Sequence, residues 1–207
     1  MYPTKQITKT QLETLRRVMV KRIAKDLTAE KLSFLMGRPQ NYVTNIESLI
    51  TDPYNMDDLK SIAIALDEKN YKGFFAKIAD QTLVNVMVEA ESSGNQCVHT
   101  YSIITEEYKK QLYFTLQEDL PSAVRSSENN EYDSMIATDA VKLLIRVGYF
   151  FKSRLPVNVY QSVNRFLKVT ISPTYVQNAL NSFCDGENEG ALKRSEKAGK
   201  GIFYIEA

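Results

Sequence analysis

The sequence predicts a mainly α-helical protein with a small amount of β-structure, and three observations carry this prediction. Apolar residues recur at helical spacing in three short blocks within residues 27–66, and Gly37 separates the first two blocks. From Thr82 apolar and polar residues alternate, which is typical of a half-buried strand. After residue 134, three more helical patterns precede two short strand-like segments. We therefore expect four parts: an N-terminal helical bundle with a helix-turn-helix at 1–80, a central β-hairpin and helix at 81–120, a linker at 121–134, and a helical unit with two strands at 135–207.

The composition indicates a soluble globular protein. The chain has 207 residues, of which 43% are hydrophobic and 25% charged. No apolar run approaches the roughly 20 residues that span a bilayer, and the N-terminus has no apolar signal core. Cys97 and Cys184 are the only cysteines, and two distant cysteines do not make a disulfide framework. We expect a cytoplasmic protein that does not contact membranes.

The charges are unevenly distributed. Residues 1–26 hold seven basic and two acidic residues, and residues 135–207 hold ten and six. Residues 71–134 hold five basic and ten acidic residues. Basic ends around an acidic middle suit contact with a polyanion at both ends, although they also suit a solvated surface of uneven charge.

In the first part, we expect a helix at 10–25 with an apolar stripe inside and its basic residues, Arg16, Arg17, Lys21, Arg22 and Lys25, on the surface. Thr28 can cap a second helix, Gly37 suits the turn, and Pro39 suits the start of a third helix. Val43, Ile46 and Ile50 are expected to form the buried stripe of that helix. Asn55, followed by Asp57 and Asp58, starts a fourth helix, and residues 71–79 suit a fifth.

In the middle part, the strand that starts at Thr82 and a return strand at 97–104 flank a turn at 92–95, which predicts a hairpin. Residues 106–120 suit a helix, because Tyr108, Leu112 and Leu116 are four residues apart. Residues 121–134 are polar and serine-rich and read as a linker.

In the last part, residues 136–151 suit a buried helix, residues 157–167 a second, and Ser172-Pro173 the start of a third. Residues 191–205 suit two short strands around a basic turn.

Residues 10–67 resemble the Cro/phage-repressor-like (Xre-type) helix-turn-helix family. The likeness rests on Leu27 and Thr28 at the start of the second helix, Gly37 at the turn, and the run from Tyr42 to Glu47. The resemblance implies that the third helix lies in the major groove of DNA, with Gln40, Asn41, Thr44 and Asn45 meeting the bases. It also implies phosphate contacts, for which Arg38 and residues of the basic first helix such as Arg17 are candidates. Two departures from the family pattern weaken the expected phosphate contacts. Ala29 stands where the family often has a glutamine, and Pro39 stands where it commonly has a capping residue.

The C-terminal part resembles winged-helix domains more loosely. There Gln177 and Asn178 face outward on the last helix. The resemblance assigns Lys193, Arg194, Lys197 and Lys200 to the wing, which commonly meets phosphate or the minor groove. Winged helices also serve as protein-docking modules, so this unit has two possible roles.

Residue clusters for catalysis are missing from the sequence. His99 is the only histidine, so a histidine triad or a zinc site lacks ligands. Gly199-Lys200-Gly201 lacks the other residues of a phosphate loop. We therefore expect no enzyme, no metal and no cofactor.

The resulting hypothesis is a sequence-specific binding protein for double-stranded DNA, a transcriptional regulator of a prokaryote or mobile element. One recognition helix reads few base pairs, so we expect two half-sites, supplied by a homodimer or by the two modules of one chain. The central hairpin is a candidate dimer contact, or else an inner sheet edge within one chain. The alternative is a protein-interaction module, such as an antitoxin-like protein that binds a partner through its acidic middle.

Overall fold

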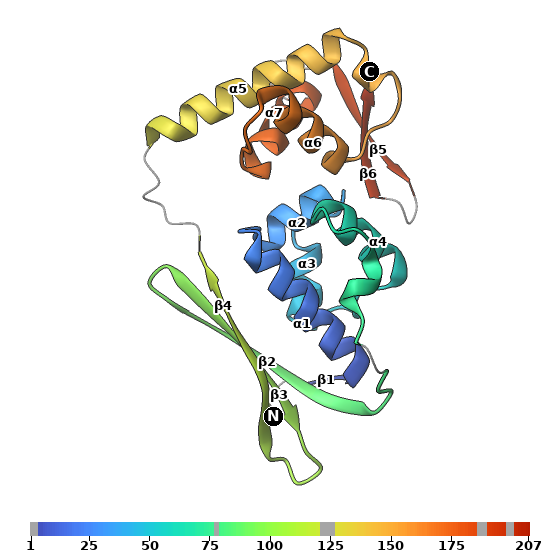
Figure 1. Cartoon of the computed structure of the whole chain (residues 1–207), viewed down its shortest axis with the longest axis vertical. Helices are drawn as coiled ribbons and strands as arrows, with labels where there is room; N and C mark the ends of the chain where they lie inside the picture. The colour runs from blue at the N-terminus through green and yellow to red at the C-terminus, as the bar shows by residue number, and fades with distance from the viewer. Residues whose placement is uncertain (1–3, 77–78, 121–126, 186–189, 198–200) are drawn as a thin grey trace. The chain divides into compact units, whose positions relative to one another are not determined.

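A computed structural model describes residues 4–76, 79–120, 127–185, 190–197 and 201–207, with seven α-helices and two small sheets in these ranges (Figure 1). Contacts divide the chain into two compact units, residues 1–32 with 41–122 and residues 33–40 with 123–207. None of the described helices is both long and apolar enough to cross a membrane. Helices are thus the larger part of the described residues, as the sequence predicts, but roughly a quarter is strand, which is more β-structure than expected.

The elements from the N-terminus to the end of the sheet are a strand, four helices, a 3-10 turn and three further strands. They are β1 (Lys5–Thr8), α1 (Lys9–Ala24), α2 (Ala29–Leu35), α3 (Tyr42–Glu47), α4 (Met56–Ala65), η1 (Tyr71–Phe74), β2 (Leu83–Ser93), β3 (Gln96–Ile104) and β4 (Lys110–Asp119). The strands form one antiparallel sheet in the order β1-β2-β3-β4. The hairpin prediction is confirmed, since β2 and β3 pair from Ser93 with Gln96 to Asn85 with Ile104.

Several local predictions in this part are wrong. Residues 106–120 hold β4 and not a helix, since Leu112, Phe114 and Leu116 also alternate and β3 pairs with them. The short strand β1 was not predicted, and residues 71–79 hold only the 3-10 turn η1.

The third helix starts at Tyr42, so Pro39, Gln40 and Asn41 precede it. It ends at Glu47, and Leu49 then adopts a φ of 56°. This left-handed turn buries Leu49, whereas Ile50, expected in the core, is 70% exposed.

The caps of the helices follow the sequence more closely. Thr28 accepts a hydrogen bond from the amide of Lys31 at 3.2 Å. Asn55 accepts from the amides of Asp57 and Asp58, and Asp58 accepts in return from the amide of Asn55. Gly37 has a φ of 69°, which glycine adopts without strain. The predicted roles of these three residues are confirmed.

The C-terminal elements are three helices, a 3-10 turn and two strands. They are α5 (Ser127–Arg146), η2 (Tyr149–Phe151), α6 (Pro156–Leu167), α7 (Pro173–Asp185), β5 (Leu192–Lys197) and β6 (Gly201–Glu206). β5 and β6 form the predicted antiparallel ribbon, and an isolated bridge joins Arg154 to Tyr204 of β6. The core of this part includes Val141, Phe150, Val163, Val176 and Leu180.

Two predictions for α5 are wrong. The helix begins at Ser127, inside the expected linker; residues 121–126 of that linker lie outside the described residues. The helix is also not buried all round, because only one face is in the core and Val147, just beyond its end, is 69% exposed.

Candidate nucleic-acid interface

The row of polar side chains that the sequence assigns to base contact lies at the surface. Gln40, Asn41 and Thr44 are exposed, and Asn45 is half-buried. Asn41 occupies the N-cap position of α3, but its side chain makes no capping hydrogen bond within the described residues. Its amide is therefore available to an external partner, as amide groups that read base edges must be.

The inner side of α3 is tied to α4 by a contact between two side chains that the sequence did not predict. The Tyr42 hydroxyl lies 2.9 Å from both carboxylate oxygens of Asp58 and donates to that carboxylate. Asp58 is almost fully buried and also caps α4. A single carboxylate thus links the first turn of α3 to the first turn of α4, which limits how far α3 can rotate.

The other end of α3 is held by a buried arginine. Arg22 of α1, expected on the surface, is 0% exposed. Its Nε and Nη2 atoms donate to the two carboxylate oxygens of Glu47 at 2.9 and 2.8 Å. Its Nη1 and Nη2 atoms donate to Glu118 of β4 at 2.6 and 2.8 Å, and Nη1 also donates to the Leu27 carbonyl at 2.6 Å. The prediction that Arg22 is a surface residue is wrong because these two carboxylates satisfy its charge inside the protein.

Tyr101 of β3 completes this internal contact between the sheet and α3. Its hydroxyl donates to the Glu47 carbonyl at 2.6 Å and lies 3.1 Å from the Met19 sulfur. The ring stacks on Phe114 of β4, with centroids 4.3 Å apart. We name the group of Arg22, Glu47, Glu118 and Tyr101 the bracing cluster, because it joins α1, α3 and the sheet.

The protonation of the bracing cluster follows from its burial and its charges. Burial acts to raise the pKa of Glu118, but hydrogen bonds and the charge of Arg22 outweigh it and lower that pKa to about 2. Full burial raises the pKa of Glu47 above its usual range, and Arg22 opposes this only in part. Burial acts to lower the pKa of Arg22, but the two carboxylates raise it, so the guanidinium stays charged.

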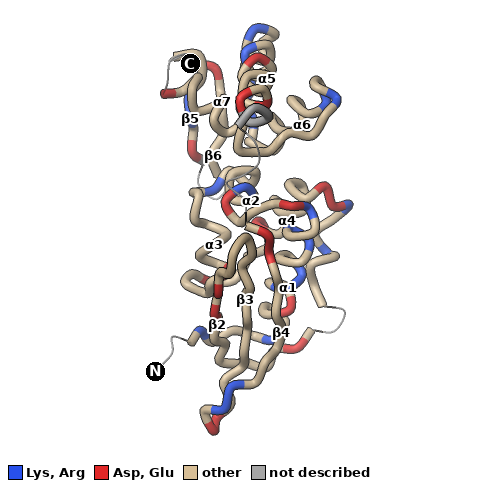
Figure 2. The backbone as a smooth tube through the Cα atoms, turned by 90° about the vertical axis from the view of Figure 1, so that its left-hand side faces the viewer, with Lys and Arg blue, Asp and Glu red and all other residues tan. Residues whose placement is uncertain are grey.

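Most basic residues of the N-terminal segment are already paired. Arg16 and Arg17 both bind Glu13 on the same helix, at 2.8 and 2.9 Å. Hydrogen bonds from Arg16, and less strongly from Arg17, lower the pKa of Glu13 although burial acts against them. Elsewhere in this segment Lys5 pairs with Asp52, Lys9 with Asp80 and Lys21 with Glu68. Figure 2 accordingly shows basic and acidic residues interspersed over the first unit. Arg17, expected at a phosphate, would therefore have to break its ion pair with Glu13 before it could bind DNA.

The remaining predicted residues lie in different surroundings. Arg38 is half-buried. On α7, Asn178 is exposed and Gln177 half-buried. On β5, Lys193 is exposed, whereas Arg194 donates to Asn181 at 3.1 Å and pairs with Asp185. Lys197 ends β5 with its side chain outside the described atoms, and Lys200 lies outside the described residues.

The structure and the sequence agree on the surface of α3 but not on what holds it. Asn55 and Asp58 form a capping box that the sequence pattern could have revealed in full. The partners of Arg22 lie 25 and 96 residues away, and no local pattern indicates them.

Metal-binding groups were also sought, and the described residues contain no group of three or more His, Cys, Asp or Glu side chains placed to hold a metal ion.

Comparisons with models of protein families, with curated proteins and with solved structures give no match to this chain.

Proposed function

We propose that this chain is a sequence-specific binding protein for double-stranded DNA and acts as a transcriptional regulator of a prokaryote or mobile element. The observation that carries the proposal is the exposed row of Gln40, Asn41 and Thr44 at the start of α3. Glutamine and asparagine amides can pair with adenine through two hydrogen bonds, and threonine can bind a base edge or a thymine methyl group. The resemblance of residues 10–67 to Xre-type repressors assigns the same surface to the major groove.

The bracing cluster and the contact between Tyr42 and Asp58 support this role for α3. Reading a base edge needs donors and acceptors held in place before binding, because each side chain ordered at the interface loses entropy. Both ends of the six-residue helix are anchored to other elements by buried polar contacts. A helix this short has little stability of its own, so these contacts supply its position.

The C-terminal unit supports a second point of contact. Its element order, three helices followed by an antiparallel ribbon, suits a winged helix. Asn178 on α7 and Lys193 on β5 are exposed and would meet a base edge and a phosphate, respectively. A homodimer, or the two units of one chain, would supply the two half-sites that DNA readers of this kind use.

The test is selection of a preferred sequence from a random duplex library, followed by affinity measurements on the selected and a scrambled duplex. Gln40→Ala combined with Asn41→Ala removes two exposed amides and no hydrogen bond of the described structure. Since one good base contact is worth about 1–3 kcal/mol, the double variant should lose at least about tenfold in affinity for the selected duplex and little for the scrambled one. Asn85→Ala with Gln81→Ala, two exposed amides outside α3 and the turn before it, is the matched control. Equal losses on both duplexes, or no loss, would refute the assignment of α3 as the reader.

A second candidate is a protein-interaction module, and the pairing of the α1 cations favours it. A chain that binds DNA through phosphates needs cations free to replace counterions, and Arg16, Arg17 and Lys21 are engaged. On this view a basic partner protein binds the acidic middle of the chain. Failure to select any duplex, together with a salt dependence of DNA affinity too shallow for several phosphate contacts, would favour the second candidate.

A further inference from the structure

One face of α5 exposes large apolar side chains at helical spacing. Met135 is 56% exposed, Leu143 38% and Val147 69%, and Tyr132 continues the row one turn earlier. The steps of three, eight and four residues keep these side chains on one side of the helix. We name these four residues the α5 stripe. From Met135 to Val147 the α5 stripe extends about 18 Å at 1.5 Å per residue.

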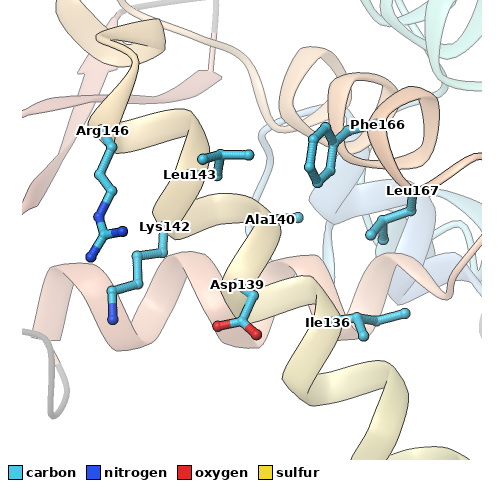
Figure 3. Close-up of a pocket in the computed structure, with 8 residues that line it drawn as sticks. All are labelled: Ile136, Asp139, Ala140, Lys142, Leu143, Arg146, Phe166 and Leu167. Atoms are coloured by element: carbon cyan, nitrogen blue, oxygen red, sulfur yellow. The ribbon is translucent and has the colours of Figure 1, made fainter.

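A hollow beside the α5 stripe extends this apolar surface to α6. It has a volume of about 370 Å³ and is lined by Ile136, Ala140, Leu143, Phe166 and Leu167, together with charged residues of α5. Figure 3 shows Leu143 pointing toward Phe166, which is itself 57% exposed. Exposed apolar side chains that gather on one face of a protein often mark a contact surface.

Three charges accompany the α5 stripe, and Asp139, four residues from both Met135 and Leu143, lies between them on the same face. Asp139, Lys142 and Arg146 project from α5 on the side away from Phe166 and Leu167 (Figure 3). None of the three forms an ion pair with another described residue. Lys142 and Arg146 are four residues apart, a spacing at which like charges repel on a helix. This face of α5 thus carries one anion and two cations that are not paired with any described residue.

We propose that the α5 stripe binds the α5 stripe of a second copy of this chain, with the two helices antiparallel. A two-fold axis that crosses α5 near Val141 brings Asp139 of each copy between Lys142 and Arg146 of the partner subunit, and it also brings the two Lys142 side chains near each other. By symmetry the same contact forms twice. The same register brings Met135 against Val147 of the partner subunit, so that apolar groups meet apolar groups.

The charge pattern is what selects a second copy as the occupant. In an antiparallel pair of identical helices, each residue before the midpoint of the contact faces a residue after the midpoint on the other helix. In the antiparallel order each Asp139 meets the two cations of the partner subunit, with one like-charge approach between the two Lys142 side chains; a parallel pair would set all three like charges together. This pairing would supply the two half-sites needed by the proposed function, but its test measures assembly and not DNA binding, so either proposal can fail alone.

The test measures the mass of the full chain in solution by sedimentation velocity over a range of concentrations. Wild type is expected to form a concentration-dependent dimer. Asp139→Lys sets three cations against three cations, and Lys142→Asp with Arg146→Asp sets three anions against three anions. Each variant alone should raise the dimer dissociation constant at least about tenfold. An equimolar mixture of the two variants should form a heterodimer, because the cationic face then meets the anionic one.

Two more variants separate this interface from general effects of charge. Met135→Asp buries a charge in the apolar part of the contact and should also give monomers, with an unchanged circular dichroism spectrum because Met135 lies outside the core. Lys152→Asp with Lys193→Asp, two exposed sites of the same unit away from the α5 stripe, should leave the dimer intact. A wild-type chain that stays monomeric at every concentration, or a dimer that persists in both charge variants, would overturn the proposal. So would variants that fail to form a heterodimer when mixed.

Discussion

Replacing Arg22 with methionine is the most direct test of how α3 is held. The change removes a buried guanidinium that makes five hydrogen bonds of 2.6 to 2.9 Å: two to Glu47, two to Glu118 and one to the Leu27 carbonyl. Methionine fills part of the space, so the loss is mainly electrostatic: two carboxylates remain inside without their cation. Removing one partner of a buried ion pair lowers stability by about 3–5 kcal/mol, and we expect Arg22→Met to fall in this range.

The loss is measured by urea unfolding. The chain has no tryptophan, so far-UV circular dichroism follows the transition. Hydrogen-exchange mass spectrometry on peptides of α1 and α3 assigns that transition to the first unit. With a denaturant dependence of roughly 2 kcal/mol per molar, the midpoint should fall by about 1.5–2.5 M. Arg16→Met, which breaks a half-exposed contact with Glu13, is the control and should change stability by no more than about 1 kcal/mol.

A triple variant separates the stranded charges from the lost packing. Arg22→Met with Glu47→Met and Glu118→Met replaces the whole ionic group by apolar side chains. Such replacements are often neutral or stabilising, so the triple variant should recover most of the stability that Arg22→Met loses. A loss below about 1 kcal/mol in Arg22→Met would refute the electrostatic reasoning. A triple variant no more stable than the single one would assign the loss to packing.

Three further predictions concern the same unit. Tyr101→Phe removes the hydroxyl that binds the Glu47 carbonyl at 2.6 Å, and urea unfolding should show a loss of about 1–2 kcal/mol; an unchanged midpoint would mean that this bond does not hold α3. Asn55→Ala removes both capping bonds of α4 and should lose about 1 kcal/mol in thermal melts, whereas Asn85→Ala, on an exposed strand face, should stay within about 0.5 kcal/mol. Because the pKa of Glu118 is lowered from 4.5 to about 2, its contribution to stability is complete above pH 4.5 and is lost as the pH falls toward 2. Glu47, whose pKa is raised, changes stability with pH in the opposite sense, so the test compares the unfolding free energy of wild type with that of Glu118→Gln. The difference between the two should shrink from pH 6 to pH 2.5. A constant difference would contradict this role of Glu118.

Local patterns predicted most of the elements. The apolar residues of α1, α4, α6 and α7 recur with a clear helical period, and those of β2 alternate with a period of two. A few consecutive residues are therefore enough to predict a helix or a strand in these segments. The caps of Thr28 and Asn55 are equally local, since donor and acceptor lie within three residues.

β4 shows where the local signal is ambiguous. Its apolar residues fit a step of four, from Tyr108 to Leu112 to Leu116, and also a step of two, through Phe114. Only the pairing with β3, in which Leu112, Phe114 and Leu116 meet residues 10 to 17 positions earlier, favours the strand. The choice rests on tertiary contacts, which outweigh intrinsic preferences in segments like this one.

The surface of α3 could be predicted, but its support could not. A charged residue such as Arg22 belongs outside unless a partner is present, and nothing near it in the sequence indicates Glu118. The two carboxylates converge on it only after α3 and β4 have packed against α1. Residues that hold a site through such contacts are therefore found from coordinates, whereas residues of a helix that face solvent, such as Thr44, can be inferred from period alone.

Arg22 was expected at the surface and is buried, whereas α5 was expected to be buried and is partly exposed. Both errors arise because the local sequence does not show which tertiary contacts form. The many hydrophobic residues of 136–151 predicted a buried helix, yet the fully buried residues of α5 are limited to the face of Ala137, Ala140 and Val141 among the described residues. Periodicity identifies apolar faces but does not say which of them a single chain covers. An apolar face that remains exposed, beside charges that lack partners, is then better explained by a contact outside this chain than by a failure of folding. A second copy satisfies the apolar part of that face and neutralises its anion, because in the antiparallel order each Asp139 meets Lys142 and Arg146 of the partner subunit.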